Sequence, residues 1–197
     1  MAIPHINVNE SAAVYSAAPR ADSTYVLSEF RGGASAVRRD LFLRLGGFNP
    51  ALWRQTEEYD FCTRLLAHGY LTRCGTATPI LHYESPNRSL DSIFYHSARG
   101  RLIYAWRNVP WPVFPVHAAA TAAMCLRDGF RRRSVKCSAS ACVKCSASGL
   151  ASAVSAIFSS NASRCPVSLR AYLLMRRLRR RGPMKLSSAT TWLSTSP

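Results

Sequence analysis

The sequence predicts an α/β domain that is followed by a basic, α-helical extension. Over residues 1–110, short stretches of strand character alternate with stretches of helical periodicity. Residues 110–115 read Pro-Trp-Pro-Val-Phe-Pro, which cannot continue a helix and marks a domain boundary. Residues 1–120 hold 12 basic and 9 acidic side chains, whereas residues 121–197 hold 14 basic and 1 acidic side chain. The two parts therefore differ in both pattern and charge.

The composition is that of a folded protein. The chain has 197 residues and a formal net charge of +16, and 48% of its residues are hydrophobic while 18% are charged, which argues against wholesale disorder. No apolar run reaches the roughly 18 residues of a membrane-spanning helix. The N-terminus lacks the basic-then-apolar order of a signal peptide. We therefore expect a cytoplasmic location, with peripheral attachment to the inner face of the plasma membrane.

Two helices are expected in the middle of the first domain. Leu41, Phe42 and Leu45 lie at helical spacing, and Gly46-Gly47 offers a stop. The second helix begins at Thr56, whose side chain suits an N-cap, and it ends at Gly69. Acidic residues in its first turn suit the helix dipole.

Strands and further helices follow in order. Residues 70–74 and 78–83 read as two short strands. The apolar periodicity then predicts helices over residues 89–107, 116–126, 149–158 and 168–181. The last of these ends at Gly182-Pro183, and residues 184–197 form a polar tail for which we expect no structure.

Five short motifs occur in order between residues 33 and 85. They are Gly-Ala-Ser-Ala-Val-Arg-Arg at 33–39, Leu-Gly-Gly-Phe-Asn at 45–49, Glu-Glu-Tyr-Asp-Phe-Cys-Thr-Arg-Leu at 57–65, His-Gly-Tyr at 68–70 and Leu-His-Tyr-Glu-Ser at 81–85. In this order and spacing they resemble the C-terminal, acceptor-side half of family-2 glycosyltransferases. The resemblance implies a partial GT-A, Rossmann-like fold over residues 1–110. It also implies transfer of a sugar from a nucleotide-diphosphate donor to a lipid-linked or cell-surface polysaccharide acceptor.

The resemblance implies a catalytic base at the start of the second helix. An inverting transfer needs a base that takes the proton of the acceptor hydroxyl as that hydroxyl attacks the sugar. The family places this base in a short acidic motif, and the matching residue is Glu58, with Glu57 and Asp60 in supporting roles. The dipole of the helix alone is a competing explanation, because it favours acids in a first turn.

Other site residues follow from the same resemblance. His82 matches a ligand of a Mg²⁺ or Mn²⁺ ion, and Arg99 with Arg101 matches a basic pair that neutralises diphosphate charge. Contacts to the acceptor are expected from Gly33, Ala34 and Trp53. Each of these residues also has a purely structural explanation. His82 would be a hydrogen-bonded structural residue, the two arginines would lie on a solvated helix face, and Trp53 would pack in the core.

The donor side of such an enzyme is not evident. The family holds its metal and donor sugar with an Asp-x-Asp motif, and neither Asp-x-Asp nor Asp-Asp occurs in this chain. No nucleotide-binding unit of the usual length precedes Gly33. We therefore expect a truncated enzyme that is inactive alone.

The basic region after residue 110 predicts an anionic partner. We expect residues 111–183 to form a membrane-surface extension with a low-complexity linker near 134–149. In residues 168–181, cations flank an apolar face that suits an anionic membrane. A nucleic-acid partner is less favoured, because no DNA-binding motif accompanies the charge. The alternative function is a non-catalytic basic module that binds anionic membrane or nucleic acid.

The cysteines do not indicate a disulfide framework or a zinc site. Seven cysteines form an odd set, and the pair Cys142 and Cys145 lacks the second pair that a structural zinc ion needs. The sequence Val-Lys-Cys-Ser-Ala-Ser occurs at 135–140 and again at 143–148. This repeat indicates a short tandem duplication in a tolerant linker. It leaves open that the sequence beyond residue 130 is not native coding sequence.

Overall fold

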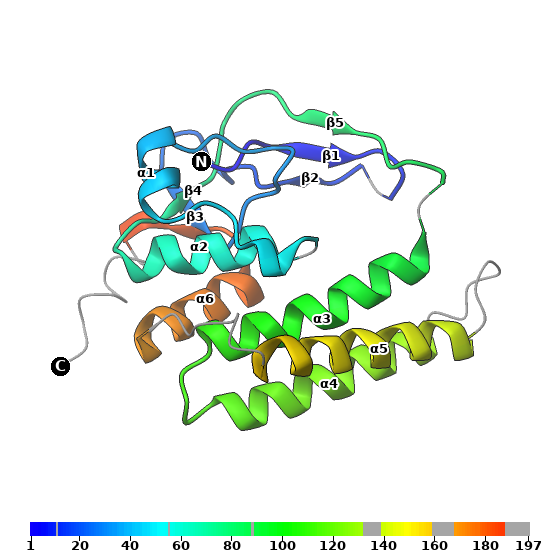
Figure 1. Cartoon of the computed structure of the whole chain (residues 1–197). Coiled ribbons are helices and arrows are strands. Elements are labelled where there is room, and N and C mark those ends of the chain that lie inside the picture. The colour runs from blue at the N-terminus through cyan, green and yellow to red at the C-terminus, as the bar shows by residue number, and fades with distance from the viewer. Residues whose placement is uncertain (11, 55, 88, 132–138, 159–167, 188–197) are drawn as a thin grey trace. The chain divides into compact units, whose positions relative to one another are not determined.

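A computed structural model describes residues 1–10, 12–54, 56–87, 89–131, 139–158 and 168–187 (Figure 1). These residues form six α-helices, one 3₁₀ helix and six short strands, so the fold is mixed α/β. The chain divides into two compact units. The sheet unit comprises Met1–Gly47, Phe61–Pro86 and Val167–Pro197, and the helical unit comprises Phe48–Asp60 and Asn87–Pro166. Each unit is described in turn.

The sheet unit contains two three-stranded sheets, and the first has the order β2-β1-β5. Strand β1 (His5–Asn7) pairs antiparallel with β2 (Val14–Tyr15). It also pairs in parallel with β5 (Ile80–His82), where Asn7 lies opposite His82. Strand β5 therefore confirms one of the two strands expected after the second helix.

The second sheet has the order β4-β3-β6, and both pairings are antiparallel. It comprises β3 (Tyr25–Leu27), β4 (Thr72–Arg73) and β6 (Met184–Lys185). Strand β6 corrects the expectation that residues 184–197 lack structure. Its backbone pairs with β3, and the amide of Leu186 donates to the carbonyl of Thr24 at 2.9 Å. Residues 188–197 lie outside the described part of the chain.

Helix α1 (Arg39–Arg44) ends in a turn that a buried arginine holds in place. Gly46 and Gly47 both have positive φ, at 79° and 62°, a conformation that glycine adopts readily. The guanidinium of Arg64, on α2 (Glu57–Ala67), donates to the carbonyl of Leu45 and, at 2.6 Å, to that of Gly47. Arg64 and the Gly-Gly turn belong to two different sequence motifs. These hydrogen bonds attach the turn after α1 to α2, so the two motifs stabilise the same part of the fold.

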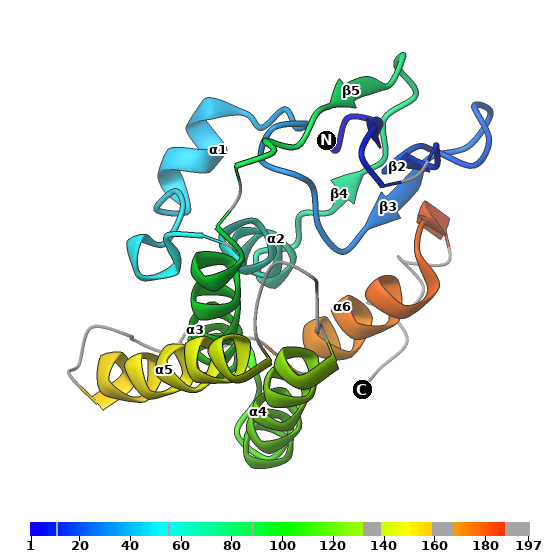
Figure 2. The ribbon, with the colours of Figure 1, turned by 90° about the vertical axis from the view of Figure 1, so that its right-hand side faces the viewer.

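Helix α6 (Leu169–Arg181) belongs to the sheet unit, which differs from the expected extension over residues 111–183. The hydroxyl of Ser168 caps it by accepting from the amide of Ala171 at 3.2 Å. One face of the helix is buried, and α6 contacts β3; the buried residues are Ala171, Tyr172, Leu174, Met175 and Leu178. Figure 2 shows α6 leading into β6 beside β3. Because this face completes the core of the sheet unit, the helix is part of that fold.

The helical unit consists of η1 (Pro50–Leu52), the start of α2, and three long helices. These are α3 (Leu90–Asn108), α4 (Phe114–Arg131) and α5 (Ala139–Phe158), and α5 packs against both others (Figures 1 and 2). Their shared core includes Leu52, Leu102, Ile103 and Ala153. None of the helices in the described ranges is long and apolar enough to cross a membrane.

The structure changes two boundaries in this region. The connector at residues 110–115 does not separate domains, because α3 and α4 lie in one unit and Pro115 falls in the first turn of α4, where proline is tolerated. The expected linker near 134–149 is helical from Ala139 onward, and residues 134–138 lie outside the described part. A Cβ added at Gly149 would overlap the carbonyl oxygen of Tyr95.

Candidate functional site

Trp53 directly follows η1 and is 74% exposed. This exposure corrects the alternative in which the indole packs into a core. The side chain of Asn49 caps η1 by accepting from the amide of Ala51 at 3.1 Å, and the guanidinium of Arg99 donates to the carbonyl of Ala51. The indole meets the imidazole of His96 edge to face, with ring centroids 5.1 Å apart. Hydrogen bonds therefore fix the turn that precedes this surface tryptophan, and His96 contacts its indole ring.

The acidic start of α2 lies a few residues further along the same unit. Glu57 and Glu58 are partly exposed. The carboxylate oxygen Oε2 of Glu57 accepts from the backbone amide of Thr56 at 2.9 Å. Burial, the larger cause, and the neighbouring charge of Glu58 raise the pKa of Glu57 above its usual range.

Thr56 does not cap the helix in the expected way. Its carbonyl accepts the first helical hydrogen bond from the amide of Asp60 at 2.8 Å, which is the position of an N-cap residue. Its Oγ1 atom is buried and has no hydrogen-bond partner within the described residues. Its φ is 151°, which is unusual for a β-branched residue. The backbone conformation carries the hydroxyl away from the N–H groups of the first turn.

Asp60, the third acid of the motif, has no exposed surface. Its Oδ1 accepts from Nδ2 of Asn108 at 2.8 Å and lies 3.8 Å from Nε of Arg107, and both partners are on α3. The rings of Tyr59 and Tyr104 pack beside this pair with centroids 4.6 Å apart. These contacts give the carboxylate of Asp60 the role of an anchor between α2 and α3. Of the three acids, Glu57 and Glu58 remain the ones that a substrate can reach.

The structure does not bring Arg99 and Arg101 together. Residues two apart on a helix point in directions about 200° apart, so the side chains leave α3 on different faces. Arg99 donates to Oγ of Ser152 on α5 at 3.2 Å and to η1, whereas Arg101 lies 3.9 Å from Sγ of Cys125 on α4. Both guanidinium groups therefore connect helices, and their convergence on one diphosphate is not seen.

His82 lies exposed at the end of β5, in the sheet unit. It contributes to the electrostatics of His5, whose pKa is lowered by burial and, to a smaller extent, by the charges of Arg31 and His82. Within the described residues, no group of three His, Cys, Asp or Glu side chains is placed to hold a metal ion. The donor set does not fit Mg²⁺ or Mn²⁺, which take several oxygen ligands.

Gly33 and Ala34 also lie in the sheet unit, in a tight turn. The amide of Ala34 donates to the carbonyl of Arg31 at 2.9 Å, and its carbonyl accepts from the amide of Ile3. Ala34 is buried, whereas a Cβ added at Gly33 would meet nothing within 4 Å. The close backbone approach expected at this glycine is therefore not required by the fold itself.

His96 joins the site although sequence patterns did not single it out. A lone histidine inside a helix carries no spacing signal, and only the turn at η1 brings Trp53 against it. Burial, followed by the charges of Arg54 and Arg99, lowers the pKa of His96, which favours the neutral imidazole at neutral pH. The helical unit thus presents an exposed indole, a neutral imidazole and two reachable carboxylates on neighbouring segments.

Comparison of the chain with protein-family models, with curated proteins and with solved structures finds no significant match in any of the three. The chain is therefore not assigned to a family. The side chains of η1, α2 and α3 described above carry the functional proposal.

Proposed function

We propose that this chain provides the acceptor side of a glycosyltransferase, in a reaction that moves a sugar from a nucleotide-diphosphate donor to a lipid-linked or cell-surface polysaccharide acceptor. The observation that carries the proposal is the exposure of Trp53 immediately before the carboxylates of Glu57 and Glu58. The motifs between residues 33 and 85 support the same assignment.

This combination of groups suits a neutral glycan. The flat indole of Trp53 offers apolar area to the C–H face of a sugar ring, and its rotation is restricted by the edge contact with His96. Carboxylates are acceptors for hydroxyl groups, which are the only donors that a neutral glycan presents in number. In this proposal an acceptor sugar stacks on Trp53, and its hydroxyl groups bind the carboxylates that follow four and five residues later in the chain.

Glu58 is the base in this proposal. It takes the proton of the acceptor hydroxyl as the hydroxyl oxygen bonds to the anomeric carbon, while the bond from that carbon to the diphosphate breaks and the diphosphate leaves with the electron pair. Glu58 is chosen because it matches the base position of the motif, and the carboxylate of Glu57 accepts a hydrogen bond from the amide of Thr56. Asp60 positions the start of α2 through Asn108.

The experiment measures binding of neutral oligosaccharides to the full chain by ligand-observed NMR. The test variant is Trp53→Ala, and the matched control is Trp111→Ala, because Trp111 is also well exposed, at 61%, and lies in the same unit. We expect binding by the natural chain, a loss of about tenfold or more with Trp53→Ala, corresponding to at least ~1.4 kcal/mol, and little change with Trp111→Ala. Equal losses in the two variants, or no binding by the natural chain, contradict the proposal.

A further inference from the structure

The structure divides the apolar residues of α6 between a buried face and an exposed face. The sequence suggested that the apolar residues of this helix face a membrane. Instead, the face formed by Tyr172, Leu174, Met175 and Leu178 is buried within the sheet unit. Those side chains are not available to a lipid surface as long as the unit is folded. Any partner must bind the opposite, solvent-exposed face.

That opposite face carries a short amphiphilic stripe, defined here as Leu169, Leu173, Arg176 and Arg180. At 100° per residue, these four positions fall within about 60° of one another around the helix and span about 16 Å along it. Leu169 is 49% exposed and Leu173 is 42% exposed, and both arginines are exposed. The first half of the stripe is therefore apolar and the second half is cationic.

The surroundings of the stripe are strongly basic. Residues 168–187 contain seven basic side chains and no acidic one. Six of these are arginines of α6, and the seventh is Lys185 on β6, which continues directly from the helix and is also exposed. The guanidinium of Arg176 lies 5.9 Å from the ring centre of Tyr172, which restrains its orientation. The charge of this segment favours an anionic partner over a neutral or cationic one.

We propose that the stripe binds the surface of an anionic lipid bilayer, with α6 lying parallel to the membrane plane. Arginine pairs well with lipid phosphate, because its guanidinium donates two parallel hydrogen bonds. Leu169 and Leu173 enter the boundary between head groups and acyl chains, where apolar side chains are stabilised. This inference stands on α6 alone and does not rest on the proposed sugar-transfer function.

The two leucines favour lipid over nucleic acid. A nucleic acid would engage the cations equally well, but it offers nothing to two exposed aliphatic side chains in line with them. A bilayer uses both halves of the stripe. This difference provides the test, because removal of the leucines weakens binding to lipid and leaves binding to nucleic acid unchanged.

The experiment is vesicle flotation of the full chain with neutral phosphatidylcholine and with phosphatidylcholine containing phosphatidylglycerol. We expect binding only to the anionic vesicles, with a decline as salt is added. Arg176→Gln with Arg180→Gln removes two cations near the surface and weakens binding about 30-fold. Leu169→Ser with Leu173→Ser also weakens it. Duplex DNA is the competing ligand in a parallel titration.

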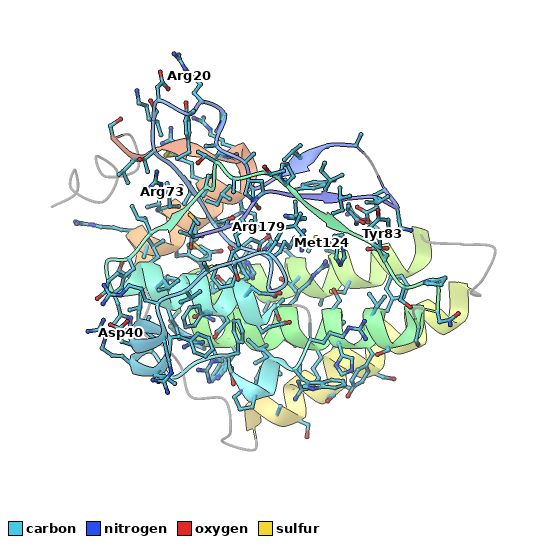
Figure 3. All side chains as sticks on the ribbon, turned by 90° about the horizontal axis from the view of Figure 1, so that it is seen from above. Arg20, Asp40, Arg73, Tyr83, Met124 and Arg179 are labelled. Carbon is cyan, nitrogen blue, oxygen red and sulfur yellow. The ribbon has the colours of Figure 1, made fainter. Side chains whose placement is uncertain are left out.

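The control removes the same charge elsewhere in the sheet unit. Arg20 lies at the outer end of the loop between β2 and β3 (Figure 3), and Arg39 lies on α1; both are exposed. Arg20→Gln with Arg39→Gln should change vesicle binding by less than about threefold, and circular dichroism verifies that every variant is folded. Equal binding to neutral vesicles, equal loss in the control, or leucine variants that bind anionic vesicles like the natural chain each overturn the proposal.

Discussion

The side-chain amide of Asn108 donates a hydrogen bond of 2.8 Å to Oδ1 of Asp60, and neither residue has appreciable exposed surface. The pair joins the first turn of α2 to the last turn of α3. The amide of Asn108 also donates to the carbonyl of Tyr104, so one side chain closes the end of α3 and holds the acid motif. The candidate base, Glu58, therefore lies in a helical turn that the hydrogen bond between Asp60 and Asn108 attaches to α3.

Removal of either partner of this pair should destabilise the fold strongly. Asp60→Ala leaves the amide of Asn108 without its acceptor and the guanidinium of Arg107 without its ion-pair partner, and we expect a loss of about 3–5 kcal/mol in the free energy of unfolding. Asn108→Ala should cost about 1–3 kcal/mol, because it leaves a buried carboxylate with fewer donors. Urea denaturation measures both.

The matched control for these variants is Asp40→Ala on α1. Asp40 is exposed and is paired with Arg38 at the surface, so its removal should leave the urea midpoint nearly unchanged. A similar midpoint for Asp60→Ala and Asp40→Ala is incompatible with the anchoring role of the buried pair.

Two glycines should respond in opposite ways to alanine. A Cβ at Gly149 overlaps the carbonyl oxygen of Tyr95 and lies 3.2 Å from Cβ of Ala98, so Gly149→Ala should destabilise the packing of α5 on α3 by about 1–3 kcal/mol. Gly33→Ala enters open space and should be neutral. Thermal unfolding compares the two, and a stable Gly149→Ala variant would show that α5 packs elsewhere. Gly33 is also an expected contact to the acceptor. If Gly33→Ala keeps its stability but binds glycan more weakly, the glycine has a binding role and not a structural one.

The thiols of Cys62 and Cys74 should be unreactive in the folded protein. Burial raises the pKa of each thiol to about 11, from about 9 in the unfolded chain. Only the thiolate is nucleophilic, so alkylation at pH 8 should be slow until denaturant is added. Mass spectrometry after brief labelling measures the modified fraction, and rapid native labelling of either cysteine contradicts its burial.

The same thiols predict a loss of stability at alkaline pH. A group whose pKa is higher in the folded state contributes stability that is complete below the unfolded value and is lost as the pH rises through the folded value. For these thiols the loss falls between about pH 9 and pH 11. A variant with Cys62→Ala and Cys74→Ala should show a flatter dependence of the unfolding free energy in this window. An unchanged slope rules out this origin.

The raised pKa of Glu57 predicts that stability also falls as the pH rises, as for the two thiols, but in the acidic range. Because burial raises its pKa above 4.5, the folded state favours the protonated carboxyl, and this stability is lost as the pH rises through the folded value. Glu57→Gln keeps an oxygen that accepts from the amide of Thr56 but carries no charge. We expect its unfolding free energy at pH 7 to equal or exceed that of the natural chain. A clear destabilisation at pH 7 means that the charged form of Glu57 is the one the fold requires.

Nucleotide sugars should not bind this chain tightly. The chain contains no Asp-x-Asp motif, and its described residues hold no group of three metal ligands. Calorimetry with UDP-, GDP- and dTDP-sugars in the presence of Mn²⁺ should show no binding in the micromolar range. Micromolar binding would demonstrate a donor site in this chain. It would contradict the proposal that the chain provides only the acceptor side.

Local signals in the sequence were sufficient for several elements. The helices expected near residues 41–45, 56–69, 89–107 and 168–181 are confirmed within a few residues by α1, α2, α3 and α6. The ends of α1, α2 and α6 follow from glycines that adopt positive φ, namely Gly46, Gly69 and Gly182. Such signals act within one or two turns of the chain, so they can be read without the fold. The roles of Glu58 as base and of His82 as metal ligand stay predictions.

By itself the sequence determined where several of the helices lie, that the net positive charge is concentrated after residue 120, and that the acids of residues 57–60 share one helical turn. Only the tertiary structure decided which of those groups face solvent. It exposed Trp53, buried Asp60 against Asn108, directed Arg99 and Arg101 to different helices, and covered the apolar face of α6. The physical reason is that periodicity defines the faces of a helix, whereas contacts between distant segments choose which face is buried.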